Sequence, residues 1–157
     1  MPLRTPICEL LDIELPVFLA GMGGVSFAPL TAAVSEAGGF GTLGAAASSP
    51  DEIRALMREV RGLTNKPFGV DLLAVLPETL DASVEIIIEE GASAFIAGLG
   101  VPRRVVARFH EAGVKVFSMC GQVKHALAAA DAGCDAVIAQ GTEAGGHTGR
   151  VGGMALI

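Results

Sequence analysis

The sequence predicts an α/β fold in which short buried strands alternate with helices, and three observations support this class. Apolar runs of about five residues recur along the chain at intervals of roughly 20 to 27 residues. An amphipathic segment follows each run, as it does in successive strand-helix units. The runs show no alternation of polar and apolar residues, which is typical of parallel strands covered on both faces.

The six apolar runs are the strand candidates: Val17–Gly21, Gly39–Gly44, Pro67–Leu73, Ala94–Gly98, Lys115–Cys120 and Asp135–Gln140. The segments between them are the helix candidates: Ala28–Ala37, Ser49 to about Gly62, Glu78–Glu90, Pro102–Ala112 and Gln122–Ala132. Ser49 is expected to cap its helix, with Pro50 in the first turn and two acids favoured by the positive end of the helix dipole. The other helices are each followed by a glycine that can take a left-handed cap: Gly38, Gly91, Gly113 and Gly133.

Six such units in one unbroken series favour a TIM-type (β/α)8 barrel, although a doubly wound open sheet has the same local pattern. A complete barrel needs eight strands and typically about 250 residues, whereas this sequence has 157. We therefore expect one domain over residues 1–157 that forms about six units of a C-terminally incomplete barrel. Either the chain is a fragment of a longer protein, or another copy or a partner covers its open side.

Composition narrows the function classes. A content of 51% hydrophobic and 18% charged residues is that of a globular domain, and a net charge of -6 argues against a nucleic-acid surface. The three cysteines, Cys8, Cys120 and Cys134, are too far apart to suggest a zinc site or a disulfide framework, so no metal is expected. Without a leader or a long apolar span, the sequence predicts a cytoplasmic protein with no membrane partner.

The most informative segment is the glycine-rich loop that follows the last strand candidate, because it carries His147. Glycines such as Gly141 and Gly145 let a backbone approach a ligand closely, and loops after buried strands commonly hold catalytic groups. We therefore expect His147 to be functional and to face a cavity, with a loop-ordering imidazole as the alternative. Glu143 is expected to be solvated rather than to orient this ring. His110 and His125 fall on helix candidates and are interpreted as surface residues.

Two further positions are candidates for ligand binding. The loop Ala20–Val25 follows the first strand candidate, and its amides can face a flat cofactor or simply form a tight turn. Asp71 interrupts an otherwise apolar strand, where a carboxyl group is costly unless it has a hydrogen-bond partner or lies at the open end. A ligand-facing role and a structural, loop-binding role both remain open for Asp71.

Four segments together resemble the nitronate monooxygenase family, formerly called 2-nitropropane dioxygenases, and its relative the FMN-dependent enoyl-acyl carrier protein reductase. They read PVFLAGMGG (16–24), AVSEAGGFG (33–41), KPFGVDL (66–72) and DAVIAQGTEAGGHTG (135–149). They occur in the order and at spacings similar to those of the family, and they cover nearly the whole chain. The resemblance implies a TIM barrel that binds FMN at the C-terminal ends of its strands.

By position, the resemblance implies that the following residues contact the flavin: Gly21, Met22, Gly23, Asp71, Gln140, Gly141 and Gly145. It implies that His147 is the catalytic base, which takes the α-proton of a nitroalkane or holds the nitro group of a nitronate. An electron then passes to FMN, and molecular oxygen completes the oxidation. Neutral imidazole is the form that accepts a proton, so activity is expected to fall as the ring is protonated.

Three differences from the family pattern keep alternatives open. Asp71 stands where the family has an asparagine, which exchanges an amide donor for an anion. Met119 stands where some nitronate monooxygenases have a lysine, and the segment around His147 is closer to the enoyl reductases. The last two strands of the family, which hold the flavin phosphate, have no counterpart. The alternatives are therefore an enoyl reductase that uses NAD(P)H and a non-catalytic half-barrel module; a homo-oligomer is possible for each.

Overall fold

The computed structural model describes residues 3–157, with the backbone alone at residues 77–79. Five parallel strands form one sheet in the order β1-β2-β3-β4-β5, so each strand lies beside the next strand in the chain. They are β1 (Gly41–Gly44), β2 (Phe68–Leu73), β3 (Ala94–Gly98), β4 (Lys115–Cys120) and β5 (Ala136–Ala139). This unreversed order is that of a barrel wall, because a doubly wound sheet changes direction at a switch point. The predicted α/β barrel class is confirmed.

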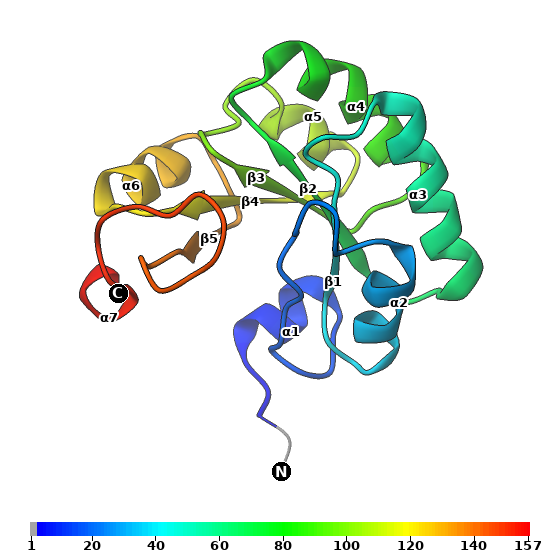
Figure 1. The fold of residues 1–157 in the computed structure, drawn as a ribbon, viewed down its shortest axis with the longest axis horizontal. Coiled ribbons are helices and arrows are strands. Elements are labelled where there is room, and N and C mark those ends of the chain that lie inside the picture. Colours follow the sequence, from blue (N-terminus) through cyan, green and yellow to red (C-terminus); the bar gives the residue numbers. More distant parts are fainter. Residues whose placement is uncertain (1–2) are drawn as a thin grey trace.

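The helices are α1 (Pro6–Leu11), α2 (Ala28–Glu36), α3 (Pro50–Leu63), α4 (Pro77–Glu89), α5 (Val106–Glu111), α6 (Val123–Asp131) and α7 (Gly153–Leu156). Of these, α2 to α6 cover the outer side of the curved sheet (Figure 1). α2 and α3 lie at the β1 edge, whereas α7 and the C-terminus lie at the β5 edge. None of the helices among the described residues has the length and apolar composition needed to cross a bilayer.

Two apolar clusters hold the layers together. The larger one lies between the sheet and its outer helices, and it joins Phe68 and Val70 of β2 to Ile53 and Met57 of α3. The smaller one lies on the inner face of the sheet, and its members are Cys8, Leu11, Ile13, Phe40, Ala94, Ile96 and Phe117. Because Cys8 and Leu11 belong to α1, this short helix covers the N-terminal end of the inner face.

The predicted helix boundaries are largely confirmed. The Ser49 side chain accepts a hydrogen bond from the Glu52 amide at 3.4 Å, and the Glu52 carboxylate accepts one from the Ser49 amide at 2.7 Å. This reciprocal pair satisfies two amides at the start of α3. The glycines expected to end the other helices all have positive φ: 89° at Gly38, 72° at Gly91, 77° at Gly113 and 88° at Gly133.

The prediction of a first strand before Gly39 is wrong. Val17–Gly21 forms only an isolated parallel bridge between Phe18 and Phe40, with two backbone hydrogen bonds of 2.8 and 2.9 Å. Beyond this bridge the chain turns back on itself, because the Ser26 hydroxyl donates to the carbonyl of Ala20 at 2.7 Å. The ladder therefore stops where the loop begins.

Three further differences concern burial and length. The prediction that all strands are covered on both faces is wrong for β5, whose Val137 is 44% exposed. The helix expected over Pro102–Ala112 is confined to α5, because Val105 donates back to the Pro102 carbonyl in a turn. The short helices α1 and α7 were not expected from the sequence.

Candidate functional site

Asp71 lies in the C-terminal half of β2, and its side chain points to the inner face of the sheet. Gly69, two residues earlier on the same face, lies against Ile96 and Phe40 of the inner cluster. Asp71 itself is only 6% exposed. A side chain on Gly21 would overlap Asp71, and the space beside Gly98 is 3.1 Å from its Oδ1. The carboxyl group is thus enclosed by backbone without side chains.

The environment of Asp71 disfavours the charged form of its carboxyl group. No described residue donates a hydrogen bond to this carboxyl group or forms an ion pair with it. Burial alone therefore raises the pKa of Asp71 from 3.8 to about 7. At neutral pH a substantial fraction of the molecules carries a protonated acid here, which can donate a hydrogen bond.

The loop over residues 20–24 packs on the C-terminal ends of β1 and β2. A side chain on Gly44, the last residue of β1, would overlap the backbone of Met22. The Met22 amide donates to the Ser26 hydroxyl at 3.1 Å, which fixes the start of the loop. The Met22 side chain is 40% exposed, and no atom lies within 4 Å of the position that a side chain on Gly23 would take. One edge of the loop is therefore open.

The loop after β5 is ordered by its own polar contacts. The Gln140 side-chain amide donates to the carbonyl of Gly145 at 3.2 Å, and Gly141 packs against the backbone of Gly153. Glu143 is exposed, as expected, but its carboxylate also accepts a hydrogen bond from the Gly153 amide at 2.8 Å. Backbone hydrogen bonds lower the pKa of Glu143. Glu143 therefore secures the start of α7 rather than the histidine.

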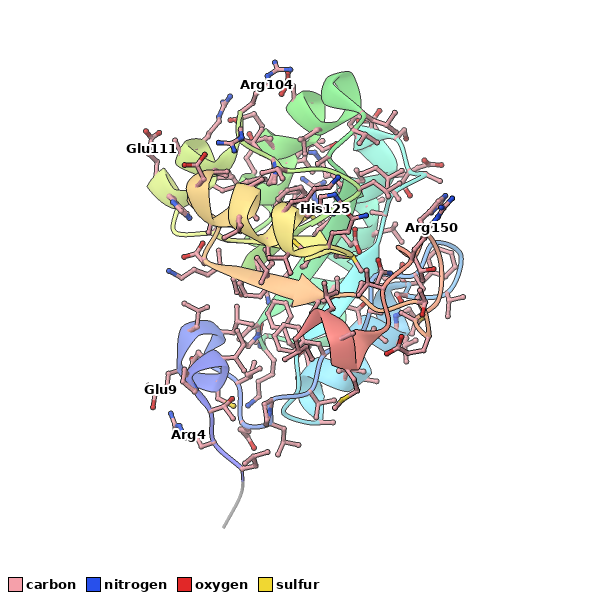
Figure 2. All side chains as sticks on the ribbon, turned by 90° about the vertical axis from the view of Figure 1, so that its left-hand side faces the viewer. Arg4, Glu9, Arg104, Glu111, His125 and Arg150 are labelled. Atoms are coloured by element: carbon pink, nitrogen blue, oxygen red, sulfur yellow. The ribbon has the colours of Figure 1, made fainter. Side chains whose placement is uncertain are left out.

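His147 lies on the same loop with its ring exposed, and it makes no hydrogen bond or ion pair with another described residue. The ring lines neither the hollow along the inner face of the sheet nor the small hollow beside Asp12, so its position at a cavity stays a prediction. Figure 2 shows Arg150, three residues further on, projecting away from the body of the molecule.

The other two histidines lie on helices, as expected. His125 of α6 is exposed and is labelled in Figure 2. The Nε2 of His110 lies 2.8 Å from the Asp135 carboxylate, which also accepts a hydrogen bond from the Val116 amide. This contact links α5 to the start of β5, at the end of the sheet opposite to the Asp71 side.

A hollow of about 350 Å³ runs along the exposed inner face of the sheet. Its walls are apolar and consist of Ile7, Pro16, Phe18, Phe117, Ala136, Val137 and Ile138. No group of three or more His, Cys, Asp or Glu residues in the described part of the chain is arranged to hold a metal ion.

The structure thus gathers the candidate residues into two groups at the C-terminal ends of the strands. On one side Gly21 lies against Asp71 and Met22 lies against Gly44, and Gln140, Gly141 and Gly145 form the other group. His147 joins neither group through a described contact. Gly44 and Gly98 complete the first group but were not singled out from the sequence. The available signal was that each is the glycine that ends a buried strand.

Comparison with known proteins identifies relatives along the whole chain. A family model described as nitronate monooxygenase matches residues 4–83 and 79–157. The chain is 43% identical over its full length to 44% of the (3aS,4S,5R,7aS)-5-hydroxy-7a-methyl-1-oxo-octahydro-1H-indene-4-carboxyl-CoA dehydrogenase of Mycobacterium tuberculosis. It is 35% identical to the nitronate monooxygenase of Pseudomonas aeruginosa, where the match covers 90% of this chain and 51% of that protein.

Solved structures agree with this assignment. FabK from Thermotoga maritima superposes with a TM-score of 0.94 at 40% identity, over 98% of this chain and 49% of FabK. A nitroalkane oxidase from Streptomyces ansochromogenes superposes with a TM-score of 0.83 at 34% identity, over 92% of this chain and 51% of the oxidase. The chain therefore spans about half the length of the relatives it matches. With its matched sequence and its half-barrel of parallel strands, the chain belongs to the nitronate monooxygenase family.

Proposed function

We propose that this chain, residues 1–157 as one domain, forms the half of an FMN-dependent oxidoreductase that contacts the flavin ring. The observation that carries the proposal is the buried, unpartnered carboxyl group of Asp71 beside the glycine loop at the C-terminal ends of the strands. In barrels of this type the reacting groups lie at that end. The relatives bear the names of oxidoreductases, a dehydrogenase and a monooxygenase. Localisation in the cytoplasm is part of the same proposal.

The residues present fit a flat ring system. Gly21 and Gly98 let the backbone pack directly against Asp71, and the open space at Gly23 leaves the outer edge of the loop accessible. Met22, Gln140, Gly141 and Gly145 would complete the contacts to the flavin. When bound, FMN would supply the chemistry of accepting electrons from the substrate.

For the reaction itself, we propose oxidation of a nitronate or nitroalkane with molecular oxygen. With a nitroalkane, His147 would take the proton from the carbon beside the nitro group, which leaves the electron pair of the C–H bond on the substrate for transfer. With a nitronate, which has already lost that proton, His147 would hold the nitro group. Its exposed position on the loop after β5 supports this role, because a ring without protein partners is free to meet a substrate. The opposite wall of the pocket would come from the region of the relatives that this chain does not match.

A second candidate function is the oxidation or reduction of a thioester substrate with a nicotinamide as the partner. The relative that is 43% identical over the whole chain is named as acting on a carboxyl-CoA compound, whereas the nitronate monooxygenase of Pseudomonas aeruginosa is 35% identical. In this case the same glycine loop and Asp71 would hold the flavin, and the substrate would differ. A third possibility, a half-barrel that binds no flavin, predicts a colourless protein.

The test measures oxygen uptake with a nitronate and, separately, flavin bleaching by NAD(P)H and turnover of an enoyl-CoA. Oxygen uptake supports nitronate oxidation, whereas rapid bleaching with no uptake supports the thioester enzyme. A His147→Asn variant should bind FMN as the wild type does and lower turnover of the neutral nitroalkane by a factor on the order of 10² to 10⁴. His125→Asn, which changes an exposed histidine on α6, is the matched control and should have no effect. Unchanged turnover in His147→Asn would exclude this residue as the base.

A further inference from the structure

Asp71 is a buried polar residue whose carboxyl group the protein itself leaves unpaired. Buried carboxyl groups in folded proteins have hydrogen-bond partners in the large majority of cases, because burial without one costs free energy. Asp71 is 6% exposed, and none of the described residues is its partner. It faces the inner side of the sheet near the C-terminal end of β2, between two glycines. A bound ligand is the partner that such a position can still acquire.

We propose that Asp71 binds the flavin as a neutral carboxylic acid, which donates a hydrogen bond from its O–H to an acceptor atom on the edge of the ring. This inference rests on the proposed FMN site and names the protonation state that the site requires. A protonated carboxyl group and a side-chain amide each offer a donor to a ligand oxygen or ring nitrogen. An aspartate therefore serves here without placing a negative charge against the flavin.

The surroundings of Asp71 explain why the neutral form persists at moderate pH. The elements packed against it are the loop over residues 20–24, β1 and β3. The residues that they present to it are Gly21, Gly44, Ile96 and Gly98, and none of these ionises. No cation lies near enough to favour the carboxylate, so desolvation acts unopposed and raises the pKa of Asp71 to about 7.

The protonation state of Asp71 should control the affinity for FMN, which can be measured without turnover. If only the protonated form binds, the apparent Kd for FMN is the intrinsic value divided by the protonated fraction. With a pKa of about 7, this fraction falls by about 30-fold between roughly pH 5.5 and pH 8.5. Binding of FMN should in turn raise the pKa of Asp71, because the ligand selects the protonated form.

The experiment measures the Kd for FMN by quenching of flavin fluorescence across this pH range. It compares the wild type with Asp71→Asn, which keeps a donor but does not titrate, and with Asp71→Ala, which removes the donor. The phosphate of FMN also titrates near pH 6, so the informative quantity is the ratio of wild-type Kd to Asp71→Asn Kd at each pH. Asp131→Asn, which changes an exposed carboxylate on α6, is the control and should follow the wild type.

The inference predicts a ratio that is nearly constant at low pH and rises by about 30-fold toward pH 8.5. Asp71→Ala should bind FMN more weakly than the wild type at pH 5.5. A ratio that stays constant with pH, while FMN still binds, would overturn the role of Asp71 and leave the proposed flavin site standing. If neither protein binds FMN at any pH, the proposed function fails as well. Urea unfolding of each variant, measured without FMN, separates loss of binding from loss of folding.

Discussion

Replacement of Asp71 by asparagine should change how the stability of the flavin-free protein depends on pH. Burial holds the pKa of this carboxyl group at about 7, against 3.8 for an unburied one. The native state therefore keeps a proton that the unfolded chain releases between these two values. Stability contributed by the protonated acid is complete below about pH 3.8 and is lost as the pH rises through about 7.

The magnitude follows from the pKa difference. Each unit of difference between the folded-state and unfolded-state pKa corresponds to about 1.4 kcal/mol. Ionisation of Asp71 therefore lowers the free energy of unfolding by up to about 4 kcal/mol above neutral pH. Asparagine does not titrate, and its own burial cost is the same at every pH. The unfolding free energy of Asp71→Asn minus that of the wild type should therefore rise by up to about 4 kcal/mol between pH 4 and pH 8.

Urea unfolding at several pH values measures this difference. Carboxylates whose pKa is lowered, such as Glu90 and Asp135, are present in both proteins, and their contributions cancel. Asp131→Asn, on the surface of α6, is the control for replacing an exposed carboxylate by an amide. If the Asp71→Asn difference is flat over the same pH range, then the carboxyl group is not held neutral by burial, and the reasoning is refuted.

Three further outcomes follow from packing and hydrogen bonding. Gly21→Ala should lower the free energy of unfolding by about 1–3 kcal/mol, because the added methyl group overlaps the buried Asp71. Gly23→Ala is the control, since its methyl group has free space, and equal urea midpoints for the two variants would contradict this. Phe109→Ala should lower the free energy of unfolding by about 3–5 kcal/mol, since this fully buried ring stacks on Phe95 in the larger apolar cluster. A decrease below about 1 kcal/mol, measured by urea unfolding, would argue against that packing. Glu143→Gln should accelerate hydrogen exchange at the Gly153 amide, measured by NMR; unaltered exchange would show that the carboxylate does not secure α7.

The helix boundaries were predictable because local chemistry determines them. Ser49 with Glu52 three residues later is a capping pair that acts within one turn, and a glycine such as Gly133 ends a helix through its own backbone. Neither depends on contacts made far away along the chain. The start of α1 has a comparable local signal, since Pro6 follows Thr5, but six residues contain little periodicity to support it.

Features set by distant neighbours were not predictable from the sequence. Val17–Gly21 is apolar enough for a strand, yet the turn held by Ser26 limits it to one bridge. Val137 belongs to an apolar run, but its exposure depends on which elements reach β5. The sequence indicated that burying the Asp71 carboxyl group in an apolar strand costs free energy. Its lack of a hydrogen-bond partner could not be predicted, because it depends on the glycines that surround it in space. The role of His147 stays a prediction.

The glycine turns that end the helices have a practical consequence for experiments on this protein. Gly91 and Gly113 precede β3 and β4, so they lie at the end of the sheet opposite to Asp71, and no neighbouring atom lies within 4 Å of either Cβ position. β3 has five residues and therefore spans about 17 Å between these two ends. A dye, a purification tag or an inserted loop placed near these turns would not contact the proposed flavin site at the C-terminal ends of the strands. The molecule can thus be attached to a surface through the N-terminal ends of its strands while ligands enter at their C-terminal ends.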